Sequence, residues 1–249
     1  MCLMAFAWQV GKYPLTLLGN RDEFYARPTR EAVFWVEEGL PDLLAGKDLE
    51  AGGTWLGVTR GRRFAALTNI RAPGASTAPR SRGQLALDYL CSTMSPDDYL
   101  EQLAADAGEY GGFNLIVGDE QQLWIFNSHD KQARQLAPGV YGLSNGNLES
   151  GWPKQQRLRD GLQKNPDRDS ATLLELLADS RVYPDAELPS TGIRLELERA
   201  LSAAFITGDQ YGTRASTFLR LGQSGGFTFV ERRYGPMGVM TGESSWQLD

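Results

Sequence analysis

The chain has 249 residues, of which 41% are hydrophobic, 22% charged and 10% aromatic, a composition typical of a globular protein and not of a disordered one. Its net charge of -6 and its lack of clustered Lys or Arg argue against a nucleic-acid partner. The single histidine excludes metal sites built from several histidines, and the sequence indicates neither a metal nor a cofactor.

Neither a membrane segment nor an export signal is expected. The N-terminal apolar run, residues 2–8, is shorter than the roughly 20 residues of a membrane-spanning helix and has no basic flank. The two cysteines allow at most one disulfide, and no Asn-x-Ser/Thr acceptor occurs. We therefore expect a cytoplasmic protein without an integral membrane segment. Cys91, in an apolar stretch, is expected to be a buried core thiol.

Paired strands dominate the predicted elements. Residues 2–8 and 15–20 are apolar runs joined by a segment with Gly and Pro, which predicts a hairpin. The same pattern recurs in three further pairs of runs: 55–59 with 64–69, 113–117 with 123–127, and 216–221 with 227–233. The 28 glycines fit a chain with many tight turns.

Amphipathic segments between the hairpins predict five helices, over residues 82–93, 96–105, 153–164, 171–180 and 194–204. Ser95 before Pro96 is a helix start signal. Residues 183–192 form a loop and the one candidate lid. Because antiparallel hairpins cannot build a doubly wound parallel sheet, we expect an α+β fold in which helices sandwich two packed sheets. No domain boundary is visible, so residues 1–249 are expected to form a single domain.

Cys2 is the first candidate for chemistry. A small residue after Met1 is the situation in which the initiator methionine is normally removed, which would make Cys2 the N-terminus. The α-amine titrates near ~8 and the thiol near ~8.5, so one residue would carry both nucleophile and general base without any histidine. The alternative is that Cys2 merely starts a buried strand.

A block of four polar residues, 20–23, follows an apolar strand directly. Burial in an apolar core does not explain it. If the first two strands pair, the block lies near one end of the hairpin, and the register decides which end meets Cys2. Asp22 could hold the α-ammonium, and Arg21 could lower the thiol pKa and bind a substrate carboxylate. The alternative is a solvated turn with an Arg–Asp ion pair.

These two features carry a resemblance. Met1-Cys2 opening a strand, followed by Asn20-Arg21-Asp22-Glu23, resembles the NRDE family, which is named for that tetrapeptide and includes the transport-and-Golgi-organisation proteins. Later blocks of that family are matched by residues 52–58, 67–69, 142–145, 152–154 and 211–217. The family in turn resembles N-terminal nucleophile hydrolases. The resemblance implies a four-layer αββα sandwich of two mostly antiparallel sheets, in agreement with the predicted hairpins and helices.

The resemblance also implies roles for individual residues. In bile salt hydrolases and penicillin V acylases the N-terminal Cys attacks an amide carbonyl, which corresponds to Cys2, and a nearby Arg and Asp resemble Arg21 and Asp22, although those families space the pair differently. An Asn of the oxyanion hole is matched by Asn145, and a late Arg near the nucleophile by Arg214. The candidate ligand-binding residues are Asn20, Glu23, Trp55 and Asn69.

Three other patterns have simpler explanations. Residues 142–146 fit Gly-x-Ser-x-Gly, but the α/β hydrolase fold needs its histidine after that motif, and His129 precedes it. His129 is most simply a turn residue, and a role as haem ligand rests on that side chain alone. Trp55, Trp124 and Trp152 could line a ligand pocket, but aromatic residues in strands usually pack in a core.

The leading hypothesis is an N-terminal cysteine nucleophile hydrolase or acyltransferase that acts on a small non-peptide amide or acyl compound. The rival is a non-catalytic binding or trafficking protein for an amphipathic anion such as haem or acyl-CoA, because members of this family have been linked to haem mobilisation and lipid metabolism. Arg-rich loops at residues 60–63 and 80–82 could meet the anionic groups of such ligands. The sequence leaves the ligand and the oligomeric state open.

Overall fold

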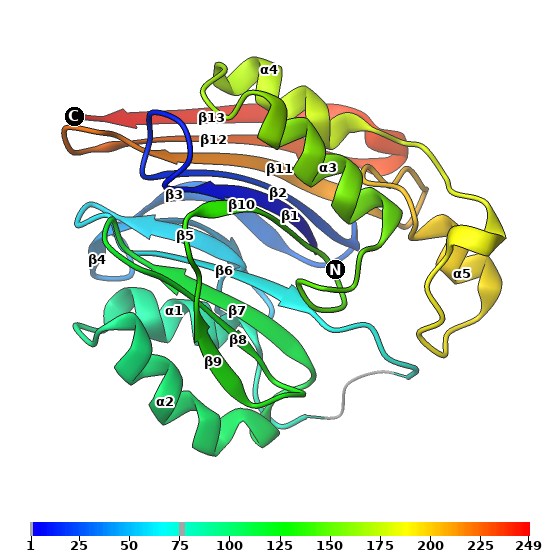
Figure 1. Ribbon diagram of the computed structural model, residues 1–249, viewed down its shortest axis with the longest axis horizontal. Helices are drawn as coiled ribbons and strands as arrows, with labels where there is room; N and C mark the ends of the chain where they lie inside the picture. Colours follow the sequence, from blue (N-terminus) through cyan, green and yellow to red (C-terminus); the bar gives the residue numbers. More distant parts are fainter. Residues whose placement is uncertain (1, 75–77) are drawn as a thin grey trace.

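The computed structural model describes residues 2–74 and 78–249, and within them two antiparallel sheets pack face to face between two layers of helices (Figure 1). The predicted four-layer αββα sandwich is therefore confirmed. The six-stranded sheet has the order β10 (Gly139–Leu143), β1 (Cys2–Trp8), β2 (Leu15–Phe24), β11 (Tyr211–Leu221), β12 (Phe227–Tyr234), β13 (Met240–Leu248). The seven-stranded sheet has the order β3 (Thr29–Trp35), β4 (Leu40–Asp48), β5 (Leu56–Thr59), β6 (Phe64–Asn69), β7 (Phe113–Gly118), β8 (Leu123–Asn127), β9 (Gln132–Gln135).

Helices cover the outer face of each sheet. In Figure 1, α1 (Gly83–Cys91) and α2 (Pro96–Asp106) lie under the seven-stranded sheet, and α3 (Pro153–Lys164) and α4 (Ser170–Leu174) lie over the six-stranded one. The short α5 (Leu195–Ala200) sits at one end of the sandwich. Four 3₁₀ turns complete the described elements: η1 (Ala107–Glu109), η2 (Glu175–Ala178), η3 (Asp185–Glu187) and η4 (Pro236–Gly238). Ser95 caps α2 as predicted, accepting from the backbone N–H of Asp98 at 3.3 Å.

Strand β1 shows how the sequence directs its side chains to two different cores. All seven of its residues are buried, because it lies inside the six-stranded sheet with a layer on each face. Its even-numbered residues, Cys2, Met4, Phe6 and Trp8, pack between the sheets, and its odd-numbered ones, such as Leu3, pack under the helical layer. The pleat therefore places the Cys2 side chain between the two sheets.

Several elements differ from the sequence expectations. The strands β3, β4, β9, β10 and β13 were not predicted. Polar or exposed residues interrupt the apolar patterns of β3, β4, β9 and β13, and two glycines weaken the pattern of the short β10. The predicted helix over 171–180 splits into α4 and η2, and the one over 194–204 ends at Ala200. Cys91 is exposed, not buried, because the buried face of α1 contains Tyr89 and Leu90 and turns away before its last residue.

None of the helices in the described ranges combines the length and the apolar character that a bilayer crossing requires.

Candidate functional site

Cys2 opens onto a cavity of about 150 Å³ between the ends of the two sheets, beside the start of β1 (dark blue in Figure 1). In the antiparallel register of β1 with β2, Cys2 lies directly opposite Arg21. The register therefore brings the end of β2, with its polar block, to the nucleophile candidate. Arg21, Asp22 and Glu23 all line the cavity with Cys2. Met1, whose removal the sequence predicts, lies outside the described residues.

Trp55 and Arg21 form a stacked pair in the cavity wall. The Arg21 guanidinium carbon lies 4.2 Å from the centroid of the Trp55 ring, a cation–π contact. Gly46 of β4 also lies against the ring, where a Cβ would approach Trp55 Cη2 to 2.5 Å. Trp55, 8% exposed, thus lines the cavity and also packs in the core between the sheets.

Asp22 is fully buried at the end of β2. One of its carboxylate oxygens accepts a hydrogen bond from Thr213 Oγ1 at 2.7 Å, and the same hydroxyl accepts from the backbone N–H of Ile206 at 2.9 Å. Burial raises the pKa of Asp22, because it disfavours the charged carboxylate, while the positive charge of Lys154 opposes the shift. Asp22 is thus held in a fixed position beside Cys2.

Lys154 is a candidate residue that the sequence reasoning missed. It lies in the first turn of α3, 3% exposed, and its Nζ donates to the backbone carbonyls of Leu201 at 2.8 Å and Ala203 at 3.4 Å. Burial lowers its pKa to about 8, against the opposing charge of Asp22. The signal in the sequence is its spacing: Lys154 precedes the buried Leu158 by four residues and so shares its helix face.

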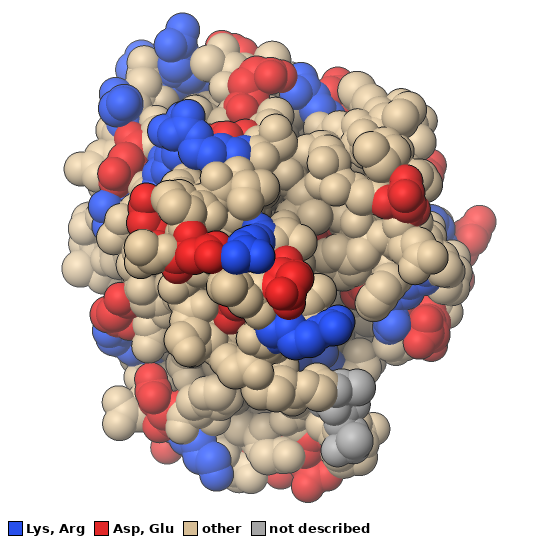
Figure 2. Space-filling view, turned by 90° about the vertical axis from the view of Figure 1, so that its right-hand side faces the viewer, with Lys and Arg blue, Asp and Glu red and all other residues tan. Residues whose placement is uncertain are grey.

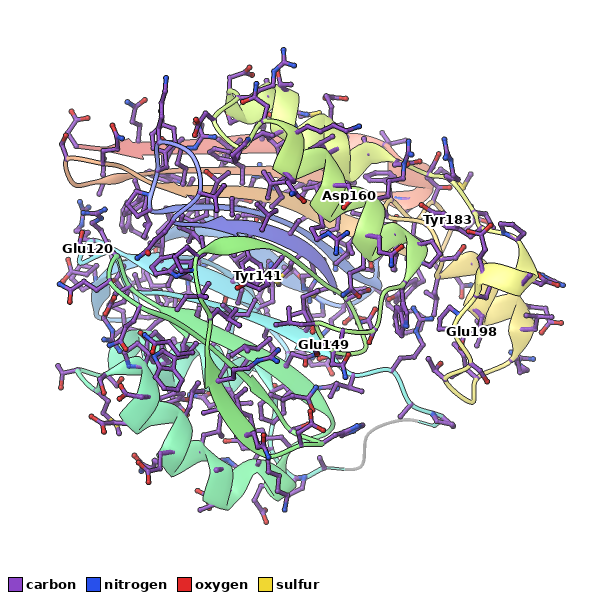
Figure 3. The ribbon with its side chains drawn as sticks, viewed as in Figure 1. Glu120, Tyr141, Glu149, Asp160, Tyr183 and Glu198 are labelled. Atoms are coloured by element: carbon purple, nitrogen blue, oxygen red, sulfur yellow. The ribbon has the colours of Figure 1, made fainter. Side chains whose placement is uncertain are left out.

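A buried ion pair lies beside this lysine. Arg71 Nη1 is 2.5 Å from Glu198 Oε2, and both side chains are nearly inaccessible to solvent. The other carboxylate oxygen of Glu198 accepts from the backbone N–H and the hydroxyl of Thr191. Glu198 is labelled on α5 in Figure 3, at the end of the sandwich near the start of β1. The pair therefore ties the 190–200 segment to the end of the sandwich that holds the site.

The far wall of the cavity brings in further charged residues. Arg27 donates from Nε to Asp48 Oδ2 at 2.7 Å, and both line the cavity. Arg82, from one of the Arg-rich loops noted in the sequence, also lines it, and burial lowers its pKa. Gly53 allows this wall to close, because a Cβ there would lie 2.3 Å from the backbone carbon of Gly83. On the face of the molecule at this end, acidic and basic side chains are interspersed (Figure 2).

The environment of Cys2 disfavours its thiolate form. Burial raises the pKa of the Cys2 thiol, the negative charge of Asp22 raises it further, and Arg21 opposes both. A group that accepts the proton during attack would therefore be needed for nucleophilic chemistry.

Three of the predicted site residues lie outside the Cys2 cavity. Asn20 lies on the outer face of β2, where it donates to the carbonyls of Leu177 at 2.9 Å and Ala204 at 2.8 Å and accepts from Ser216 at 2.6 Å. It connects the sheet to the helical layer.

Asn145 and Arg214 adjoin the cavity without being among the described residues that line it. Asn145 Nδ2 donates at 2.8 Å to the backbone carbonyl of Asn69, which does line the cavity. Arg214 Nη1 donates to the backbone carbonyls of Arg27 at 2.5 Å and Phe24 at 3.2 Å, and Arg214 lines a neighbouring cavity. The six other predicted residues, Cys2, Arg21, Asp22, Glu23, Trp55 and Asn69, share the Cys2 cavity.

His129 lies in an exposed turn after β8, as expected. Across residues 2–74 and 78–249, no three His, Cys, Asp or Glu side chains are grouped so that they could hold a metal ion.

The chain is similar to known proteins over nearly its full length. A family model described as Transport and Golgi organisation 2 matches residues 1–236. The Transport and Golgi organization protein 2 homolog of Bos taurus is 36% identical, over 93% of this chain and 92% of that protein. The homolog of Homo sapiens is 32% identical over the same shares of the two chains.

Two solved structures share the fold. The C2A mutant of conjugated bile acid hydrolase from Clostridium perfringens has a TM-score of 0.54 at 9% identity, covering 100% of this chain and 92% of that one. The Caenorhabditis elegans ortholog of N-acylethanolamine-hydrolyzing acid amidase has a TM-score of 0.50 at 12% identity, covering 88% and 92%. At these identities the likeness concerns the fold alone.

Proposed function

The chain belongs to the Transport and Golgi organisation 2 family, and we propose that Cys2 makes it an acyl-transfer enzyme, a hydrolase of carbon–nitrogen bonds in a small non-peptide amide. The observation that carries the proposal is the placement of Cys2 on a cavity, opposite Arg21 and beside the buried Asp22. The names of the two fold neighbours, an N-acylethanolamine-hydrolyzing amidase and a conjugated bile acid hydrolase, support an acyl amide as the substrate. The two free thiols fit a reducing compartment, and we propose the cytoplasm.

The mechanism requires Met1 to be removed, so that the α-amine of Cys2 is free. In the first step Cys2 Sγ bonds to the substrate carbonyl carbon, the thiol proton moves to the α-amine, and the carbonyl π electrons move to the oxygen. The tetrahedral intermediate then collapses, the C–N bond breaks, and the leaving amine takes the proton from the α-ammonium. Water, deprotonated by the same amine, hydrolyses the thioester and restores Cys2. Asp22 holds the ammonium form of the amine.

Asn69 is the better placed of the two asparagines to stabilise the oxyanion, because it lines the cavity. Asn145 then acts as a positioning residue, since its side-chain amide donates to the Asn69 carbonyl. This arrangement modifies the direct role that the resemblance implies for Asn145. Removal of one oxyanion donor typically lowers kcat by about 10²–10³-fold.

The volume of the cavity limits the size of the substrate group that can lie beside Cys2. Pockets that enclose a drug-sized ligand measure about 300–1,000 Å³, whereas this one measures about 150 Å³. It therefore holds the reacting amide and a few neighbouring atoms, and the rest of a larger substrate would extend beyond it.

The test is acyl-enzyme formation, in a Cys91→Ser background because Cys91 is exposed and would react on its own. Intact mass first shows whether Met1 is absent. Brief treatment with p-nitrophenyl hexanoate should then add one hexanoyl group to Cys2 and release a burst of nitrophenol, and Cys2→Ala should abolish both. An acyl ester is a better probe than an alkylating reagent, because it tests acyl transfer to Cys2 and not only the reactivity of its thiol. Retained Met1, or an unacylated Cys2, would refute the proposal and favour the rival, a non-catalytic carrier.

A further inference from the structure

A second cavity, of about 100 Å³, adjoins the Cys2 cavity and shares two wall residues with it, Arg21 and Trp55. The stacked pair thus borders both cavities, which meet beside the Arg21 guanidinium. The remaining wall comes from β3, β11, β12 and β13 and includes Arg214 and Glu231. One water occupies about 30 Å³ of liquid, so the cavity has room for a group of a few heavy atoms, such as a carboxylate or a phosphate.

Arg214 faces this cavity without an acidic partner of its own. Within the described residues it forms no ion pair, and its hydrogen bonds go to the carbonyls of Arg27 and Phe24 and to the hydroxyl of Thr29, all from Nη1. Burial lowers the pKa of Arg214, and the positive charge of Arg21 lowers it further, while the negative charges of Glu23 and Asp48 oppose the shift. Two guanidinium groups therefore repel one another here, and an anion between them would relieve the repulsion.

In the described part of the chain, the Arg21 guanidinium also lacks a hydrogen-bond acceptor. It is 6% exposed, yet its guanidinium donates no hydrogen bond within the described residues, and Nη1 is fully buried. Its ion pair with Asp48 is long, at 3.6 Å, and that carboxylate already accepts from Arg27 at 2.7 Å. Buried donors without acceptors are costly, so a ligand acceptor beside Arg21 would be strongly favoured.

The other arginines around the cavity have acidic partners, whereas Glu31, which also lines it, forms no ion pair within the described residues. Arg30 pairs with Glu38 at 2.8 Å, and Arg233 lies 3.9 Å from Glu231. Glu231 accepts from the backbone N–H of Ala32 at 2.9 Å, and burial raises its pKa, which lessens its repulsion of an anion. Arg21 and Arg214 are thus the cations that remain for a ligand.

We propose that an anionic group binds between Arg21 and Arg214, and that it belongs to the amine portion of an acyl amide whose carbonyl lies beside Cys2. This rests on the proposed function for the reacting end. The arginine-lined cavity does not suit an apolar acyl chain, so the charge belongs to the amine. The substrate class is therefore an acyl amide of an amino acid or a similar amino-carboxylate or amino-phosphate compound.

The experiment compares two probes of matched size, N-hexanoylglycine, which is an anion, and N-hexanoylethanolamine, which is neutral. Calorimetric binding to the Cys2→Ala variant removes turnover from the measurement. We expect N-hexanoylglycine to bind at least ~10-fold more tightly, because charge-assisted hydrogen bonds are the stronger ones. Arg214→Gln in the same background should remove that preference, Arg214→Lys should keep part of it, and Arg134→Gln, at an exposed arginine, should keep all of it.

Inorganic phosphate identifies the source of the anion. Competition of phosphate with N-hexanoylglycine that depends on Arg214 supports the site, whereas phosphate binding with no preference between the two acyl probes overturns the assignment to a substrate. Equal affinity for both probes, or a preference that survives Arg214→Gln in a folded variant, overturns the inference. Hydrolysis by the Cys2-containing protein is measured separately. If neither probe is hydrolysed but binding follows the expected pattern, the proposed function fails and the anion site stands.

Discussion

Replacement of Lys154 by Met should change how stability depends on pH. The pKa of Lys154 is lowered from 10.5 to about 8, because burial disfavours the ammonium form. Between these pH values the unfolded chain binds a proton that the folded chain has lost, so stability increases as pH rises through this window. A change of one pH unit corresponds to about 1.4 kcal/mol. The lowered pKa therefore makes the free energy of unfolding about 3 kcal/mol smaller at pH 7 than at a pH where Lys154 is deprotonated in both the folded and the unfolded chain. Most of it, about 2 kcal/mol, is gained by pH 10.

Urea unfolding at pH 7 and pH 10 measures this effect. The wild-type protein should gain about 2 kcal/mol relative to Lys154→Met between the two pH values. Lys164→Met is the matched control, because Lys164 ends the same helix but is exposed, and its profile should parallel the wild type. All three proteins are compared in a Cys2→Ala background, because the charge of Cys2 interacts with that of Lys154. A Lys154→Met profile parallel to the wild type would refute the reasoning.

Two further substitutions test the packing around the site. Gly46→Ala should destabilise the protein by about 1–3 kcal/mol, because the new Cβ would meet the Trp55 ring; Gly108→Ala, which meets nothing within 4 Å, should be near neutral in the same denaturant titration. Glu198→Gln should cost about 3–5 kcal/mol because it leaves the Arg71 guanidinium buried and unpaired. The double variant Arg71→Met, Glu198→Leu should recover much of that loss. A thermal midpoint of this double variant no higher than that of Glu198→Gln would contradict this explanation.

The elements whose apolar residues recur at regular spacing were predictable from the sequence. The 2–8 and 15–20 runs pair as β1 and β2, and α2 starts at Ser95, because alternation and capping are local properties. The strands β9 and β13 were missed because exposed edge strands need no apolar face, and their pairing is set by neighbours. Local patterns thus gave the centre of each sheet and not its margins.

The candidate site was predictable to the extent that it follows from one register. Once Cys2 lies opposite Arg21, the rest of the polar block must be close by. The position of Lys154 depends instead on how α3 packs against β1 and β10, and that of Arg214 on how the start of β11 pairs with β2. No local pattern specifies either. Cys91 shows the same limit, because its exposure depends on where a helix face ends.

The tetrapeptide at the end of β2 consists of two interleaved pairs with different neighbours. The side chains of Arg21 and Glu23 lie on the inward face of β2, with Cys2 and Trp55. Asn20 and Asp22 lie on the outward face, where they bond to the helical layer and to β11, although Asp22 also borders the Cys2 cavity at the end of the strand. Because a strand repeats every two residues, inserting or deleting one residue before Asn20 would exchange the pairs, turning the amide and carboxylate toward Trp55 and the guanidinium toward the helices. The roles of the four residues therefore depend on this register. A register shifted by one residue would keep the same composition, but it would remove Arg21 from the cavity wall and Asn20 from its hydrogen bonds to the helical layer.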